Sequence, residues 1–64
     1  MTKLKEIRLM KKLKQIELAK ILNVKPSTVN IAETKGIYDT RMAIKYAKAL
    51  KCNPLFLLEG LDNN

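Results

Sequence analysis

Six basic side chains stand within the first fourteen residues, a concentration suited to binding phosphate groups. The only acid among them is Glu6, and from Cys52 onward the chain has no basic residue at all. Thirteen Lys and Arg against six Asp and Glu give a net charge of +7. On so small a domain this field favours nucleic acid or an anionic membrane surface as the partner, although a lysine-rich face can also serve solubility alone. The six are Lys3, Lys5, Arg8, Lys11, Lys12 and Lys14.

The sequence lacks most of the residues that catalytic and metal sites use. The chain has no His and a single Cys, so a structural zinc site is excluded and no imidazole can act as a base for Cys52. We expect Cys52 to be a small buried hydrophobe. Because there is also no Gly-rich phosphate loop and no close pair of acids, we expect no enzyme activity, no metal, no cofactor and no small-molecule ligand. The longest apolar run, Leu55–Leu58, is too short to span a bilayer, which favours a cytoplasmic protein.

The elements that must position these side chains are helices. A chain of 64 residues makes one domain, here residues 1–64, and its apolar residues recur with helical rather than strand periodicity. The sequence therefore predicts an all-α fold, a compact bundle of five short helices, with a frayed tail at 61–64. The expected helices cover about 3–12, 15–22, 26–34, 39 or 40 to 50, and 55–59.

Two apolar stripes are expected to face the core at the start of the bundle. In the first helix the stripe consists of Leu4, Ile7, Met10 and Leu13. In the second helix it consists of Leu18, Ala19, Ile21 and Leu22.

A helix-turn-helix is predicted at about residues 15–34. Asn23 tolerates the left-handed conformation that ends a helix sharply, and Pro26 is favoured in the first turn of the next one. Ala19 is small where the two helices cross closely, and Val29 packs the later helix back onto the earlier ones. Gln15 stands at a helix N-terminus, where its amide and free backbone N–H groups can hold a phosphate.

These segments together resemble the Cro/repressor-type helix-turn-helix family of phage repressors and bacterial xenobiotic-response-type regulators. The resemblance covers nearly the whole chain. It implies a lambda-repressor-like domain of five helices that dimerises on near-palindromic double-stranded DNA operators. The segments that carry it are Leu4–Arg8, Gln15–Ala19, Val24–Glu33, Tyr46–Leu50 and Leu57–Gly60.

The resemblance also implies roles for individual residues. The third helix is expected in the major groove, where base edges carry a readable pattern of donors and acceptors. Gln15 matches a position that clamps a phosphate, and Arg41 matches one that reaches the minor groove. Arg8 and Glu33 match a buried ion pair. The residues presented to the bases are Lys25, Pro26, Ser27, Thr28, Asn30 and Ile31, and Lys14 and Lys35 flank this unit as expected backbone contacts.

The end of the chain is predicted to form a homodimer contact, weak without DNA. A terminal segment this apolar has more hydrophobic surface than a small core needs, and surplus apolar surface usually lies in an interface. The residues expected there are Leu55, Phe56, Leu58 and Leu61.

Several residues depart from the family pattern. Asn23 replaces the usual turn glycine, Lys51 stands where a glycine usually ends the fourth helix, and Ala32 fills a slot usually held by Ile or Leu. Pro26 and Ile31 occupy positions often used for polar base contacts, yet neither side chain can hydrogen-bond. Ile31 can instead meet a thymine methyl, which leaves direct hydrogen bonding to the neighbouring polar residues.

Two other function classes compete with transcriptional regulation. Residues 3–14 read as a basic amphipathic helix of the kind that lies on anionic membranes, but the segment lacks Trp and Phe and the domain core needs its apolar stripe. The second alternative is a protein-binding module, antitoxin-like or co-regulatory, with secondary DNA affinity.

Overall fold

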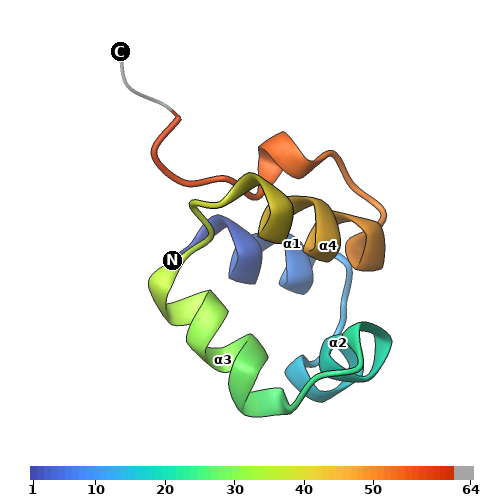
Figure 1. Cartoon of the computed structure of the whole chain (residues 1–64). Helices are drawn as coiled ribbons and strands as arrows, with labels where there is room; N and C mark the ends of the chain where they lie inside the picture. The colour runs from blue at the N-terminus through green and yellow to red at the C-terminus, as the bar shows by residue number, and fades with distance from the viewer. Residues whose placement is uncertain (62–64) are drawn as a thin grey trace.

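The computed structural model describes residues 1–61 and consists of four α-helices and one 3₁₀ turn. Figure 1 shows them packed around a common centre. An isolated β-bridge joins Ile37 to Leu58. Within residues 1–61 no helix is long and apolar enough to cross a bilayer. The elements are α1 (Lys3–Met10), α2 (Gln15–Leu22), α3 (Pro26–Lys35), α4 (Thr40–Leu50) and the 3₁₀ turn η1 (Pro54–Phe56).

The core draws side chains from every α-helix and from the segments that follow α3 and η1. Its largest fully buried members come from six places in the chain, so no single helix can bury its apolar face without the others. Small side chains also belong to the core, and Ala19 is among them. The fully buried large residues are Leu4, Leu18, Val29, Ile37, Leu50 and Leu57, and the buried alanines include Ala19, Ala43 and Ala47.

The first helix is shorter than its pattern predicts. It ends at Met10 because Lys12 adopts a left-handed conformation with φ of 59°, which turns the chain toward Leu13. Met10 was expected inward, but its side chain is 71 % exposed. A spacing of three residues falls short of a full turn, so each step rotates the side chain by about 60° away from the face that Leu4 occupies.

The turn between α2 and α3 has the predicted geometry. Asn23 is left-handed with φ of 59°, and the N–H of Val24 donates to the carbonyl of Ala19 at 3.0 Å. Pro26 then occupies the first turn of α3, where no intrahelical N–H is lost. One expectation in this region is wrong: Ile21 is 56 % exposed, because it lies to the side of the face formed by Leu18 and Ala19.

The predicted fifth helix is a single 3₁₀ turn. After η1 the chain turns at Leu57, Leu58 forms the bridge with Ile37, and the N–H of Glu59 donates to the carbonyl of Ile37 at 2.8 Å. These bonds to the α3–α4 loop replace the helical ones. Leu58 is 7 % exposed and belongs to the chain's own core, so its predicted place in a dimer interface is wrong. Residues 62–64 of the predicted frayed tail lie outside the described residues.

Glu59 joins three distant segments. Its Oε2 accepts a hydrogen bond of 2.6 Å from the backbone N–H of Lys3, at the start of α1. Its Cγ lies 2.8 Å from the position that a Cβ would take at Gly36, which has φ of +87°. A side chain at residue 36 would therefore collide with Glu59 as well as strain the backbone.

Burial is the main cause of the raised pKa values of Tyr46 and Cys52. Tyr46 lies in the core, where burial raises the pKa of its hydroxyl and the nearby Glu33 carboxylate raises it further. Cys52 is half-buried against the core. Burial raises the pKa of its thiol, opposed by the smaller influence of Lys11. A protonated thiol in this place behaves as a small apolar side chain.

Lys51→Gly is expected to raise the free energy of unfolding by about 0.5–1 kcal/mol. Lys51 closes α4 in a left-handed conformation with φ of 56°, which costs a side-chain-bearing residue more than it costs glycine. Chemical denaturation monitored by circular dichroism measures the change. The matched control, Lys48→Gly inside α4, should lower stability by a similar amount, and a loss of stability in both variants would contradict the interpretation.

Candidate nucleic-acid interface

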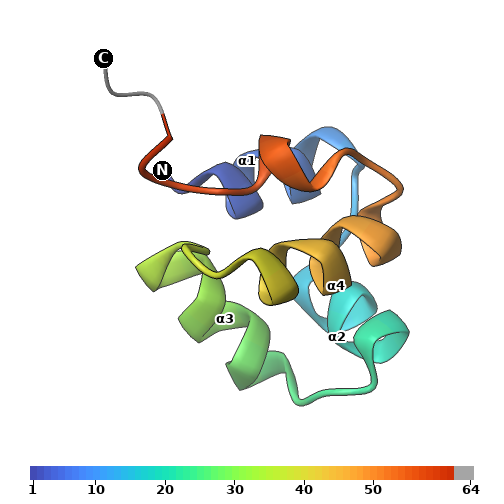
Figure 2. The ribbon, with the colours of Figure 1, turned by 45° about the horizontal axis from the view of Figure 1, so that its top comes forward.

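The start of α3 and the turn before it lie at the edge of the bundle in two views (Figures 1 and 2). The inward face of α3 consists of Val29, Ala32 and Glu33, all buried. The opposite face is open to solvent, and all six residues expected to meet bases are exposed. They are Lys25, Pro26, Ser27, Thr28, Asn30 and Ile31.

A buried ion pair fixes α3 to α1. The guanidinium of Arg8 donates from Nε to Oε2 of Glu33 and from a terminal nitrogen to Oε1 at 3.2 Å. A further guanidinium nitrogen donates to the carbonyl of Leu13 at 2.6 Å. The two side chains are 8 % and 3 % exposed. Two parallel bonds to a planar guanidinium define an orientation as well as a distance, so this pair sets how α3 sits on α1.

The same carboxylate orients the amide of Gln15. The Nε2 of Gln15 donates to Oε1 of Glu33 at 2.9 Å. The Oε1 of Gln15 faces Asn30, whose Nδ2 lies 3.5 Å away. Since an ionised carboxylate only accepts hydrogen bonds, the amide must present its nitrogen to Glu33. One N–H of that nitrogen remains for another acceptor. Gln15 thus links α2 to α3 rather than capping its own helix.

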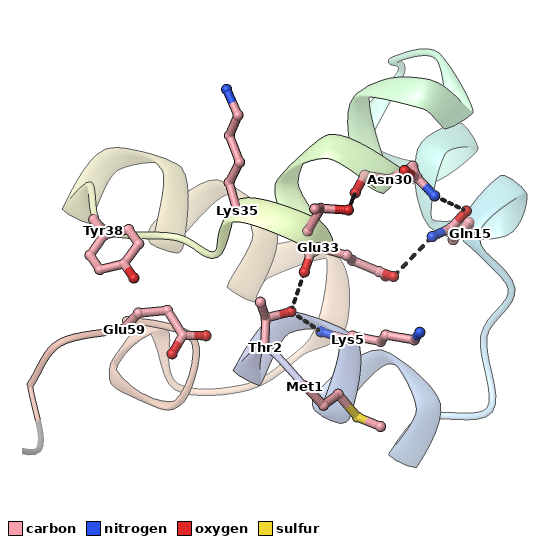
Figure 3. Close-up of a pocket in the computed structure, with 10 residues that line it drawn as sticks. Met1, Thr2, Lys5, Gln15, Asn30, Glu33, Lys35, Tyr38 and Glu59 are labelled. Atoms are coloured by element: carbon pink, nitrogen blue, oxygen red, sulfur yellow. Dashed lines mark hydrogen bonds between the residues drawn. The ribbon is translucent and has the colours of Figure 1, made fainter.

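A polar groove opens beside this network (Figure 3), with a volume of about 530 Å³. Lys5 on α1 and Lys35 on α3 lie along it, together with Gln15 and Asn30. The charge of Glu33, at its base, is matched by Arg8. Glu59 also lines the groove, at the end away from Gln15, where its Oε2 accepts a hydrogen bond from the backbone N–H of Lys3. The other end offers amide and ammonium donors, a composition that suits an anionic oxygen.

Lys5 is a member of this groove that the sequence interpretation missed. It was counted among the basic residues of the first helix, but no spacing distinguished it from its neighbours. Its place depends on the angle between α1 and α3, which only the folded structure defines. Thr34, also in the groove, donates from its hydroxyl to the carbonyl of Asn30 at 2.9 Å.

The N-terminus of α2 lies next to the groove through Gln15. Lys14 precedes the helix with an exposed side chain, and its backbone N–H donates to the Glu17 carboxylate at 2.7 Å. The first N–H groups of a helix lack intrahelical acceptors and carry a partial positive charge. Lys14 and Gln15 therefore place two polar side chains beside a helix end that favours anions.

Arg41 lies apart from the polar groove. It is exposed in the first turn of α4 and lines a separate groove of about 480 Å³ between α2 and α4, with Ile21 and Ile44. The residues predicted to contact DNA thus lie in four places: the open face of α3, the polar groove with Gln15 and Lys35, the N-terminus of α2 with Lys14, and Arg41 on α4. Among residues 1–61 no cluster of His, Cys, Asp or Glu has a composition suited to metal binding.

A family model described as "Helix-turn-helix" matches residues 4–57, which is most of the chain. No curated protein and no solved structure matches the chain significantly. The matched range runs from the first helix to the segment after η1, and so includes the ion pair, the polar groove and the open face of α3.

Proposed function

Because the chain belongs to the helix-turn-helix family and therefore binds DNA, we propose that it is a transcriptional repressor of the Cro/repressor type. In this proposal two copies bind a near-palindromic operator, each with α3 in the major groove. The open face of α3 is the observation that carries it. A helix held to the bundle by a buried ion pair, with hydroxyl and amide groups outward, is suited to reading base edges.

The polar groove supports a contact to the DNA backbone. We assign Gln15, Lys5 and Lys35 to one phosphate-binding region, with Lys14 at the neighbouring helix N-terminus. Arg41 contacts the DNA separately, at the start of α4. In this arrangement phosphate contacts set the register of α3, whereas Ser27, Thr28 and Asn30 distinguish sequences.

The homodimer is supported by the apolar surface that remains around η1. Leu55, Phe56 and Leu61 are 60 %, 59 % and 53 % exposed. Two linked half-sites raise the affinity of a small domain without any new base contact, because the second contact becomes intramolecular.

Selection of bound sites from random duplex DNA tests the proposal. We expect one enriched motif with two-fold symmetry. With four to eight phosphates neutralised, affinity for it should fall by roughly three orders of magnitude between 50 and 200 mM salt. A Ser27→Ala variant should discriminate less between the operator and random DNA while its non-specific binding stays unchanged. If both forms bind all sequences equally, specific readout is wrong.

A further inference from the structure

Ile31 is an apolar residue on the open face of the proposed recognition helix. Its side chain is 54 % exposed and stands one turn after Ser27. The open face also carries the apolar ring of Pro26, and its other members present hydroxyl, amide and ammonium groups. The side chain of Ile31 cannot donate or accept a hydrogen bond. A favourable contact with Ile31 therefore needs an apolar group on the partner.

A shallow recess of about 250 Å³ runs along the α4 side of Ile31. Its lining is mostly carbon, with polar atoms only from Thr28, Lys35 and the backbone. Ala32, whose small side chain is 3 % exposed, and the partly buried Met42 both line the recess. The residues around the recess are Thr28, Ile31, Ala32, Lys35, Gly36 and Met42.

The edge of the DNA major groove carries one apolar group, the C5-methyl of thymine. We propose that Ile31 and this recess read one thymine in each half-site through its methyl group. The inference rests on the proposed function, because it requires α3 in the major groove. It adds a specificity determinant at the position where hydrogen bonding is impossible.

The same contact rejects other bases. Where Ile31 covers an amino group or a carbonyl of a base edge, that group loses water and gains no partner. Cytosine presents an amino group in place of the thymine carbonyl and has no methyl. It therefore loses the apolar contact and also leaves its amino group without a partner. Discrimination at this base pair thus comes from apolar attraction and from unpaired polar groups together.

Replacing thymine by uracil removes only the methyl group and leaves base pairing and hydrogen-bonding groups unchanged. The experiment first selects the operator from random duplexes, then replaces each thymine in turn with uracil, symmetrically in both half-sites. We expect one position where affinity falls about fourfold per half-site, the change expected for burial of one methyl. Fluorescence anisotropy with labelled duplexes measures it.

Ile31→Ala is the decisive variant. It should bind the thymine and uracil operators almost equally, whereas Ile16→Ala should keep the wild-type ratio. Ile16 is a matched control because it is 57 % exposed but lies on α2, outside the recess. A motif with no position sensitive to uracil, or a sensitivity that survives Ile31→Ala, would overturn the methyl readout alone. Selection that enriches no motif would contradict specific DNA binding itself.

Discussion

Replacing Arg8 with alanine is expected to lower the free energy of unfolding by about 3–5 kcal/mol, the typical cost of leaving one partner of a buried ion pair alone. The Glu33 carboxylate would stay in an interior where its side chain is 3 % exposed, with Gln15 as its remaining side-chain donor. A domain of this size has a total stability of only about 3–10 kcal/mol. We therefore expect the variant to lose roughly a third or more of its stability and to melt well below the parent, as measured by thermal denaturation.

Two controls separate burial from charge. Glu6→Gln changes an exposed acid on the same helix and should alter stability by less than about 0.5 kcal/mol. Arg8→Met combined with Glu33→Leu removes both charges and should recover most of the lost stability. An Arg8→Ala protein that melts within a few degrees of the parent would show that the pair contributes little.

The paired replacement also tests the positioning role of Glu33. Without the carboxylate the amide of Gln15 keeps only its long contact of 3.5 Å to Asn30 on α3, so the stable double variant should bind DNA less tightly than the parent. A double variant with full stability and unchanged DNA affinity would mean that the ion pair serves the fold alone.

Phe56→Ser is expected to weaken operator binding by about a hundredfold or more while leaving the fold intact. Phe56 is 59 % exposed in η1, so its loss removes little from the core. If it lies in the dimer contact, the two half-sites become independent, and the gain from linked binding, about 10²–10⁴, disappears. Titration of the full operator and of a single half-site measures this, because only the former should respond.

Met10→Ser is the matched control for that experiment. Met10 is an exposed apolar residue at the end of α1, outside η1, and neither variant changes the net charge. It should leave operator affinity and sedimentation behaviour unchanged. Equal binding of the full operator by wild type and Phe56→Ser would place the dimer contact elsewhere or remove it from the proposal.

Local signals in the sequence were sufficient to define the helix-turn-helix. Asn23 and Pro26 act through their own backbone preferences, so the end of α2 and the start of α3 followed directly from residue type. The inward faces of α1 and α2 were predicted only in part. Met10 and Ile21 were expected inward, but their spacing places them beside the buried face rather than on it. The Arg8–Glu33 pair was expected only from family resemblance, and the structure contains it.

What the sequence could not define depends on distant contacts. The segment after η1 has a helical pattern, but the bond from Glu59 to the carbonyl of Ile37 and the bridge between Leu58 and Ile37 take the place of helical bonds there. Lys5 and Lys35 line one groove only because α1 and α3 cross at a particular angle. The orientation of the Gln15 amide depends on a carboxylate eighteen positions later.

The hydrogen bond from Lys3 to Glu59 has a consequence for the order in which the domain can form during synthesis. The first turn of α1 emerges early from the ribosome, yet its carboxylate partner is fifty-six positions away. The loop after α3 likewise needs the same late segment for its backbone bonds. The start of α1 and the loop after α3 therefore cannot complete their contacts before nearly all of the domain has been made, so folding on the ribosome should be completed in one late event.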